Sequence, residues 1–278
     1  MMANRPDTDA QDQLLQIITF GLQRAAGPYR RANNRRAARI DAAAENCDDS
    51  ASSVKQRREI SMRIVLLGAT GFVGSALLVE ALHRGHKVTA IVRHPEKLEK
   101  RDGLTATAGD VYDTDSLASL IAGHDALISA FNPGWTPGTV KPEMYDEQVR
   151  GTSSIIAAAR KAGIERVLWV GGAGGLEVAP GVQLIDAPGF PEWIKPGSRA
   201  TSDALEQLQK LPELDWSFLA PSAKLEPGQR TGKFRLGGDQ LLVDANGESR
   251  ISVQDYAVAM IDELERPAHI RQRFTVGY

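Results

Sequence analysis

Three glycines spaced three residues apart follow an apolar run in the segment VLLGATGFVGSALL, residues 65–78. A buried strand that ends in such a stretch enters its turn without side-chain bulk, and glycine also allows backbone angles that other residues avoid. The first amides of a helix that follows have no acceptor within the helix, so they bind anions such as a diphosphate. The residues expected to hold the diphosphate are Gly68, Thr70, Gly71, Phe72, Val73 and Gly74.

An apolar strand before this turn and a helix after it predict a dinucleotide-binding motif of the form G-x-x-G-x-x-G. Arg93 ends the second apolar run, KVTAIVR, about 20 residues further on, where NAD-binding proteins usually carry an acid for the ribose hydroxyls. An arginine there, with His94 beside it, would instead pair with a 2′-phosphate, which favours NADP while leaving NAD possible. The alternative is a solvated surface arginine.

Residues after the next two apolar runs complete the expected site. In AGDVYD, Asp110 would accept a hydrogen bond from an adenine amine and Val111 would pack on the ring, unless this segment is an ordinary polar turn. In SAFNPGW, Ala130 and Phe131 would border the ribose and diphosphate, and the loop FNPGWTPG is expected to close over a ligand.

The composition limits the class of protein. The chain has 278 residues, 42% of them hydrophobic, and a net charge of −2, so we expect a full-sized core and neither nucleic acid nor a membrane as partner. Cys47 is the one cysteine, which excludes an internal disulfide, and the histidines lack metal-ligand spacing, so no metal is expected. Without a signal-peptide pattern or an apolar run of about 20 residues, the expected location is cytoplasmic.

The chain divides into two regions of different composition. Residues 1–61 are too polar for a packed core and predict a poorly ordered N-terminal extension, upstream of a domain that begins at Met62. A start of translation at Met62, a basic interaction arm and an organellar transit segment remain alternatives for this extension. From residue 62 to 278 short apolar runs alternate with helical patterns, which predicts an α/β fold with a doubly wound parallel sheet, the Rossmann fold.

The elements expected in this domain are short. Strands are predicted near 62–68, 87–93, 104–108, 124–130, 166–172 and 214–220, and helices near 72–84, 114–122, 143–162 and 200–210. From about residue 222 onward the pattern changes to two short strands around Gly237 and Gly238, an amphipathic helix near 253–265 and a last strand in RQRFTVGY. This part is predicted to cap the carboxyl edge of the sheet, with the acids of DELE, 262–265, on a solvated helix face.

Taken together, these motifs resemble the atypical short-chain dehydrogenase/reductases. Within that superfamily, the chain is most similar to the NAD(P)H-binding group of NmrA-like, biliverdin reductase B-like and NADH-flavin reductase-like proteins. The matching segments span residues 62–278 and are GATGFVGS, IVRHPEKL, GDVYD, ALISAFNPG, VGGAGGLEVAPG, FLAPSA, GKFRLGGDQLLVD and ISVQDYAVAMIDELE. The resemblance implies that Gly171, Gly172 and Ala173 leave room beside a nicotinamide ring and that Pro221 lies against its carboxamide.

One departure from the superfamily bears on the chemistry. Its alcohol dehydrogenases use a Tyr-x-x-x-Lys pair, in which the lysine lowers the pKa of the tyrosine so that the phenol can transfer a proton. No tyrosine of this chain is followed by a lysine four residues later; the equivalent region offers Lys195 and Ser202, and Tyr145 lies on the preceding helix. Hydride transfer to a flavin-like or quinone-like small molecule, which needs no positioned acid, is therefore the predicted reaction.

Other interpretations of the site stay open. Trp135, Phe190 and Trp193 either form a wall on which an acceptor ring stacks or simply cover loops at the sheet edge. A regulatory protein that senses NAD(P) with little turnover, like NmrA-like proteins, fits the same motifs, and an isomerase or dehydratase is a weaker third hypothesis. The expected oligomeric state is a monomer or a homodimer.

Overall fold

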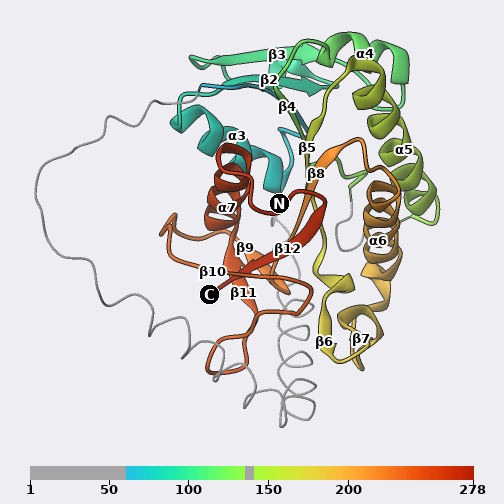
Figure 1. The fold of residues 1–278 in the computed structure, drawn as a ribbon, viewed down its shortest axis with the longest axis vertical. Coiled ribbons are helices and arrows are strands. Elements are labelled where there is room, and N and C mark those ends of the chain that lie inside the picture. Colours follow the sequence, from blue (N-terminus) through green and yellow to red (C-terminus); the bar gives the residue numbers. More distant parts are fainter. Residues whose placement is uncertain (1–60, 135–140) are drawn as a thin grey trace, which may run out of the picture.

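The computed structural model describes residues 61–134 and 141–278, and its centre is an eight-stranded sheet in the order β10-β12-β8-β5-β4-β1-β2-β3 (Figure 1). Every neighbouring pair is parallel except β10 and β12. The sheet strands are β1 (Arg63–Leu67), β2 (Lys87–Val92), β3 (Leu104–Ala108), β4 (Ala126–Ser129), β5 (Arg166–Val170), β8 (Asp215–Ala220), β10 (Arg235–Gly237) and β12 (Gln272–Gly277).

Helices cover both faces of the sheet, as expected for strands that are apolar on both sides. On one face α3 packs against α7, and on the other α5 packs between α4 and α6 (Figure 1). Two large clusters of buried side chains, one on each face, form the core. The helices are α3 (Phe72–His83), α4 (Thr114–Ile121), α5 (Met144–Ala162), α6 (Lys195–Gln209) and α7 (Val253–Glu265).

Small elements lie at the carboxyl edge of the sheet and in the loops. A two-stranded hairpin and a separate parallel pair flank the main sheet. Their members are β6 (Glu177–Ala179) with β7 (Val182–Gln183) and β9 (Lys224–Glu226) with β11 (Arg250–Ser252). Short 3-10 helices are η1 (Pro95–Lys97), η2 (Ala173–Gly175), η3 (Leu184–Asp186) and η4 (Glu192–Ile194).

The predicted doubly wound fold is confirmed, and its strands and helices mostly lie within two residues of their expected bounds. Helix α6 is the exception, because it begins at Lys195 and not near residue 200. Of the two strands predicted around Gly237 and Gly238, the first is confirmed as β10. The second is reduced to a single β-bridge between Gln240 and Glu177. The expected N-terminal extension lies outside the described residues, apart from residue 61.

The region after residue 222 differs from the predicted cap. Helix α7 and strand β12 belong to the main sandwich: β12 pairs with β8, and α7 buries Ala257, Met260 and Ile261 against the sheet beside α3. The cap prediction was wrong for these two elements because the sequence pattern carries no information on which strand a distant segment will pair with. Strand β10 also joins the main sheet, as the antiparallel neighbour of β12, whereas β9 and β11 form a separate two-stranded sheet.

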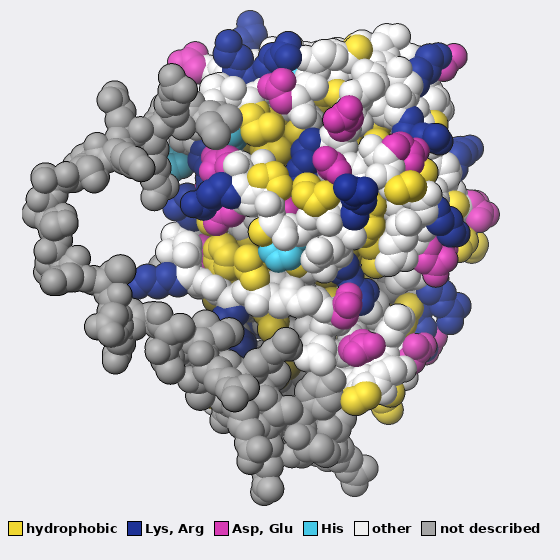
Figure 2. All heavy atoms as spheres, viewed as in Figure 1, with side chains coloured by type: hydrophobic (Ala, Val, Ile, Leu, Met, Phe, Trp, Pro, Cys, Tyr) yellow, Lys and Arg dark blue, Asp and Glu magenta, His cyan; other side chains and the backbone are white. Residues whose placement is uncertain are grey.

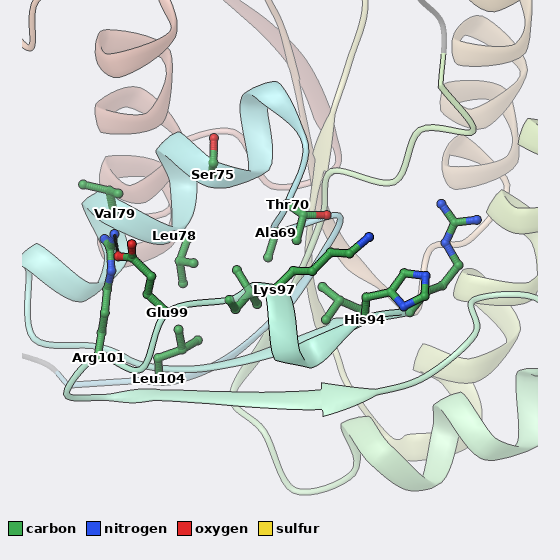
Figure 3. A pocket seen from close by; sticks show the side chains of 13 residues that line it. Ala69, Thr70, Ser75, Leu78, Val79, His94, Lys97, Glu99, Arg101 and Leu104 are labelled. Atoms are coloured by element: carbon green, nitrogen blue, oxygen red, sulfur yellow. Dashed lines mark hydrogen bonds and ion pairs between the residues drawn. The ribbon is translucent and has the colours of Figure 1, made fainter.

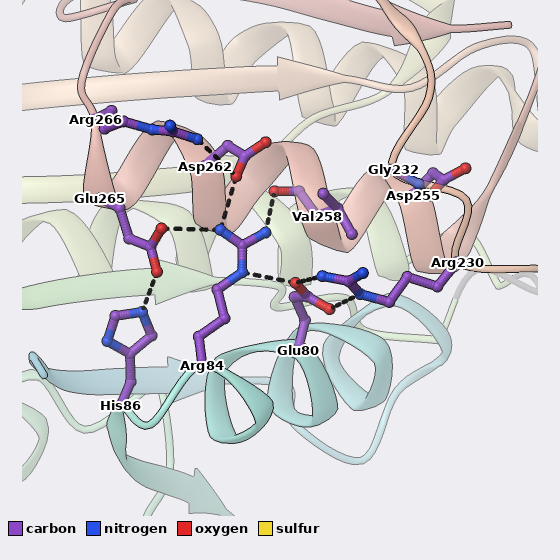
Figure 4. A network of polar contacts seen from close by, with 10 residues as sticks. All are labelled: Glu80, Arg84, His86, Arg230, Gly232, Asp255, Val258, Asp262, Glu265 and Arg266. Atoms are coloured by element: carbon purple, nitrogen blue, oxygen red, sulfur yellow. Dashed lines mark hydrogen bonds and ion pairs between the residues drawn. The ribbon is translucent and has the colours of Figure 1, made fainter. Parts of the chain in front are cut away.

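The acidic segment DELE, expected on a solvated helix face, is instead tied into ion pairs. Asp262 and Glu265 lie 2.7 and 2.9 Å from Nη1 of Arg84, just after the end of α3 (Figure 4). Glu263 is buried and pairs with Arg166 at 3.0 Å. This prediction was wrong because the cations come from the residue after α3 and from β5, roughly a hundred or more positions away in the sequence.

On the molecular face seen in Figure 2, basic and acidic side chains are interspersed over the described surface. None of the helices within residues 61–134 and 141–278 combines the length and the apolar character needed to cross a membrane.

Candidate functional site

The glycine turn brings the end of β1 against the end of β4. Gly68 has a positive φ of 77°, and a Cβ atom there would lie 2.2 Å from the carbonyl oxygen of Ala130. The Gly71 amide donates to the Gly68 carbonyl at 2.9 Å and closes the turn. A Cβ atom at Gly74 would lie 2.0 Å from the same Gly68 oxygen. Positions 68 and 74 therefore exclude side chains, because backbone occupies the space.

The N-terminus of α3 is open to an anion. The first helical hydrogen bond runs from the Ser75 amide to the Gly71 carbonyl, so the amides of Phe72, Val73 and Gly74 have no acceptor within the helix. No side chain caps this end, and its first turn carries no acid. Thr70 and Phe72 are exposed beside it. The helix dipole of α3 and its unbonded N-terminal amides together favour binding of a diphosphate at this position.

A cavity of about 510 Å³ lies next to the turn, between α3 and the segment that follows β2. Its wall includes Arg93 and His94, the two residues predicted to contact a 2′-phosphate, together with Lys97 and Arg101. Figure 3 shows the Lys97 side chain of η1 extending towards Thr70. The acid in this wall, Glu99, pairs with Arg101 at 3.2 Å. The cavity thus joins four basic side chains, one of them paired with Glu99, to the phosphate-binding turn.

Sequence reasoning missed Lys97. A signal was present, since the residue stands four positions after Arg93 in IVRHPEK, with a proline between them. That proline is the first residue of η1, whose single turn brings Lys97 back towards the glycine turn. The spacing of a 3-10 turn would have predicted this placement, but only if the short helix itself had been expected.

The residues expected near the adenosine lie at the ends of β3 and β4. Asp110 is exposed, and its Oδ1 accepts the Tyr112 amide at 3.0 Å, as in an ordinary polar turn. Val111 packs against the core cluster that Phe131 also touches. The Phe131 ring turns towards α5, since a Cβ at Gly151 would lie 2.4 Å from it. A ligand at this edge would meet the backbone of Phe131 more than its ring.

The carboxyl ends of β5 and β8 present bare backbone at the far end of the site. The Gly171 amide donates to the Leu219 carbonyl at 2.8 Å, and a Cβ on Gly171 would lie 2.3 Å from the Phe218 ring. Gly172 faces the Thr201 side chain of α6, and Pro221 is buried. Strand β5 lies next to β4 and β8 lies next to β5, so a dinucleotide held at the glycine turn would extend across β4 towards these positions.

The three aromatic residues predicted as an acceptor wall differ in their surroundings. Phe190 packs against the small buried cluster formed by Leu176, Leu184, Ala220 and Leu241. Trp193 is half-buried in η4, and Trp135 lies outside the described residues. Phe190 therefore has a structural role whatever else it contacts.

The three tyrosines near the site all have a phenol pKa above its ordinary value, for different reasons. The Tyr145 hydroxyl donates to Oδ2 of Asp203, which reaches it from α6. That hydrogen bond, together with partial burial, raises the pKa of the Tyr145 phenol. Burial also raises the pKa of Tyr112 and of Tyr256, whose hydroxyl donates to the Leu219 carbonyl at 2.7 Å. Ionisation of these three phenols is thus disfavoured.

Lys195 and Ser202, the residues present where related dehydrogenases carry the tyrosine and lysine pair, bond to different neighbours. Lys195 begins α6 and pairs with Glu192 at 2.5 Å, and the Ser202 hydroxyl donates to the Ser198 carbonyl at 3.2 Å. Within the part of the chain that the structure describes, no group of three or more histidine, cysteine or acidic residues is arranged to hold a metal ion.

The site fits a nicotinamide dinucleotide: unbonded helix amides for a diphosphate, basic side chains beside them, and the carboxyl ends of β5 and β8 further along. The sequence matches the NAD(P)H-binding family over residues 68–264. The chain belongs to this family of atypical short-chain dehydrogenase/reductases, and a nicotinamide dinucleotide is its cofactor class.

Related proteins resemble almost the whole described domain. YwnB of Bacillus subtilis, itself uncharacterised, is 40% identical over 218 residues, which cover 77% of this chain and 98% of YwnB. A candidate epimerase from Bacteroides thetaiotaomicron is 50% identical, with a TM-score of 0.72 over 78% of this chain and 97% of that one. A candidate NADH-flavin reductase from Streptococcus pneumoniae is 32% identical, with a TM-score of 0.67 over 78% and 99% of the two chains.

Proposed function

We propose that the protein is an NADPH-dependent reductase that passes hydride to a flavin-like or quinone-like acceptor without a tyrosine and lysine pair. One observation carries this proposal: Tyr145, in the first turn of α5 at the carboxyl edge of the sheet, donates a hydrogen bond to the carboxylate of Asp203. A phenol that donates a proton readily needs a nearby cation to stabilise its anion, whereas a carboxylate has the opposite effect. A reduction that requires no acid from the protein suits such a site.

Each part of the site has a role in this reaction. The turn around Gly68 holds the diphosphate, and the nicotinamide end would lie at the carboxyl ends of β5 and β8, beside Gly171 and Gly172. When bound, the reduced nicotinamide supplies the hydride, and a conjugated acceptor ring delocalises the charge that develops. The protein contributes orientation and exclusion of water, since proximity alone lowers the barrier for a transfer between stacked rings.

The preference for NADPH rests on the cavity beside the turn. Arg93, His94 and Lys97 line it, and no acid stands at the position where NAD-binding proteins hold the ribose hydroxyls. A guanidinium and an ammonium group together suit a dianionic phosphate. We expect NADH to bind more weakly than NADPH for this reason.

The test is turnover with defined acceptors. The full chain would be mixed anaerobically with NADPH and with FMN, riboflavin or a water-soluble quinone, and loss of absorbance at the reduced nicotinamide band would be followed. Steady consumption well above a no-enzyme control supports the proposal. Binding of NADPH by calorimetry without turnover of any acceptor would contradict it and would favour a protein that senses the cofactor.

The same assay separates this function from an epimerase, the reaction named for the Bacteroides relative. An epimerase returns the hydride to its substrate and consumes no cofactor overall. Net oxidation of NADPH in proportion to reduced acceptor would therefore exclude an epimerase reaction with the acceptors tried.

A further inference from the structure

Arg273 connects the last strand of the sheet to the backbone that follows β5. The side chain is 15% exposed, and its Nη1 donates to the Gly175 carbonyl at 2.8 Å. Its Nε donates to Oδ1 of Asp239 at 2.7 Å, so the guanidinium is fixed on two sides. Gly175 is the last residue of η2, which begins two residues after Gly171.

The backbone reinforces this connection. The Glu177 amide donates to the Asp239 carbonyl at 2.8 Å, and the Leu241 amide donates to the Glu177 carbonyl at 2.9 Å. Leu176, next to Glu177, is fully buried and belongs to the same buried cluster as Leu241. The segment 173–177 is therefore held by residues 239–241 and by Arg273, two segments that lie more than sixty positions later in the sequence.

The position of η2 makes these contacts relevant to the reaction. Strand β12, which carries Arg273, lies beside β8, and β8 lies beside β5 (Figure 1). Pro221 follows β8, and Gly171 and Gly172 follow β5, so η2 borders the place where the nicotinamide end and its acceptor would meet. The glycine turn that holds the diphosphate lies on the other side of β4, away from Arg273.

We propose that Arg273, with Asp239, is a positioning residue that sets the acceptor-side wall formed by residues 173–177 without contributing to cofactor affinity. This inference rests on the proposed reductase function. A guanidinium is required because one planar group must donate to a carbonyl and a carboxylate at once. A side chain that loses one of these contacts would leave η2 free to shift relative to the nicotinamide.

The experiment compares Arg273→Ala, Arg273→Lys and Asp239→Asn with the unaltered chain. Because a shift of about 1 Å in a reacting geometry costs up to about a hundredfold in rate, Arg273→Ala should lower kcat/KM for the acceptor by about tenfold or more. The NADPH dissociation constant should stay within about twofold, since the diphosphate site does not contact Arg273. Arg273→Lys, which keeps the charge but has a single donor nitrogen, should lose less than Arg273→Ala.

Arg271→Ala is the matched control, because Arg271 also flanks β12 but bonds to the Pro212 carbonyl at 2.9 Å, at the opposite edge of the sheet. It should leave acceptor kinetics unchanged. If Arg273→Ala lowered NADPH affinity and acceptor kcat/KM equally, or if Arg271→Ala had the same effect, Arg273 would serve general stability and the proposal would be overturned.

Hydrogen exchange at the amides of Leu176 and Glu177 provides a readout that needs no turnover. Exchange there should be faster in Arg273→Ala and intermediate in Asp239→Asn, in which the carboxylate is replaced by a neutral amide oxygen. Unchanged exchange would overturn the positioning role. If the unaltered chain reduced no acceptor, the proposed function would fail, while the exchange result would still decide whether Arg273 holds this segment.

Discussion

Replacing Gly74 by alanine tests the physical basis of the phosphate site. In the interior of a helix, alanine is ordinarily more stable than glycine by about 1 kcal/mol. At this position the added Cβ would lie 2.0 Å from the Gly68 oxygen and 2.7 Å from the Gly68 carbonyl carbon, both of them backbone atoms. Since an ordinary contact begins at 3.4 Å, helix α3 or the turn has to move by more than an ångström.

The two effects oppose each other, and the overlap is expected to win. Overpacking costs about 1–3 kcal/mol, and an overlap with backbone atoms belongs to the upper part of that range, about 2–3 kcal/mol, against the gain of about 1 kcal/mol in helix propensity. A net loss of about 1–2 kcal/mol corresponds to a fall in Tm of about 2–8 °C for a domain of this size. Because the moving atoms carry the diphosphate-binding amides, NADPH affinity should fall by about tenfold or more.

Thermal denaturation and isothermal calorimetry with NADPH measure both quantities. Gly238→Ala is the control, because a Cβ there meets nothing within 4 Å and Gly238 has no left-handed backbone conformation. It should leave affinity unchanged and Tm equal or slightly higher, as expected for a compatible glycine replacement. If Gly74→Ala kept the unaltered Tm and affinity, close packing of helix and turn would not explain the glycine, and the phosphate site as described would be incorrect.

Three further predictions concern single charged or hydroxyl side chains. Arg93→Glu should raise the dissociation constant of NADPH far more than that of NADH, measured by calorimetry, and equal losses would argue against a contact with the 2′-phosphate. Tyr145→Phe should leave kcat for flavin reduction within a few-fold in stopped-flow assays; a loss of about a hundredfold would reveal a proton-donating phenol. Burial raises the pKa of Glu80, but hydrogen bonds from Arg230 and Arg84 outweigh it and hold that pKa below its usual value (Figure 4). A carboxyl group whose pKa is lower in the folded than in the unfolded chain stabilises the fold at pH values above its unfolded-state pKa, and this contribution is lost as pH falls through its folded-state pKa. Arg230→Ala should therefore lower Tm at neutral pH and lower it by less at about pH 3. Equal falls in Tm at both pH values would refute this.

Local signals in the sequence were enough for the framework of the fold. The run VLLGATG predicted β1 and its turn, because a buried parallel strand needs continuous apolar residues and a turn at Gly68 needs a residue without a Cβ. The amphipathic pattern of residues 253–265 likewise predicted α7 and its buried face. The place of Arg93 beside the turn followed from the order of strands in a doubly wound sheet.

These local signals could not predict contacts between segments that are distant in the sequence. The same α7 pattern predicted a cap, yet β12 pairs with β8 and α7 joins α3, because strand pairing depends on which edge remains free after the rest of the sheet forms. The acids of DELE, predicted to be solvated, instead pair with Arg84 and Arg166.

The sequence by itself determined the fold class, the glycine turn and the family, since these depend on residue type at short spacing. The tertiary structure alone decided that Tyr145 meets the carboxylate of Asp203, that Lys97 turns back to the phosphate site and that Arg273 holds the segment after β5. Each of these joins residues from different elements, or depends on a short turn, and only folding brings such groups within bonding distance.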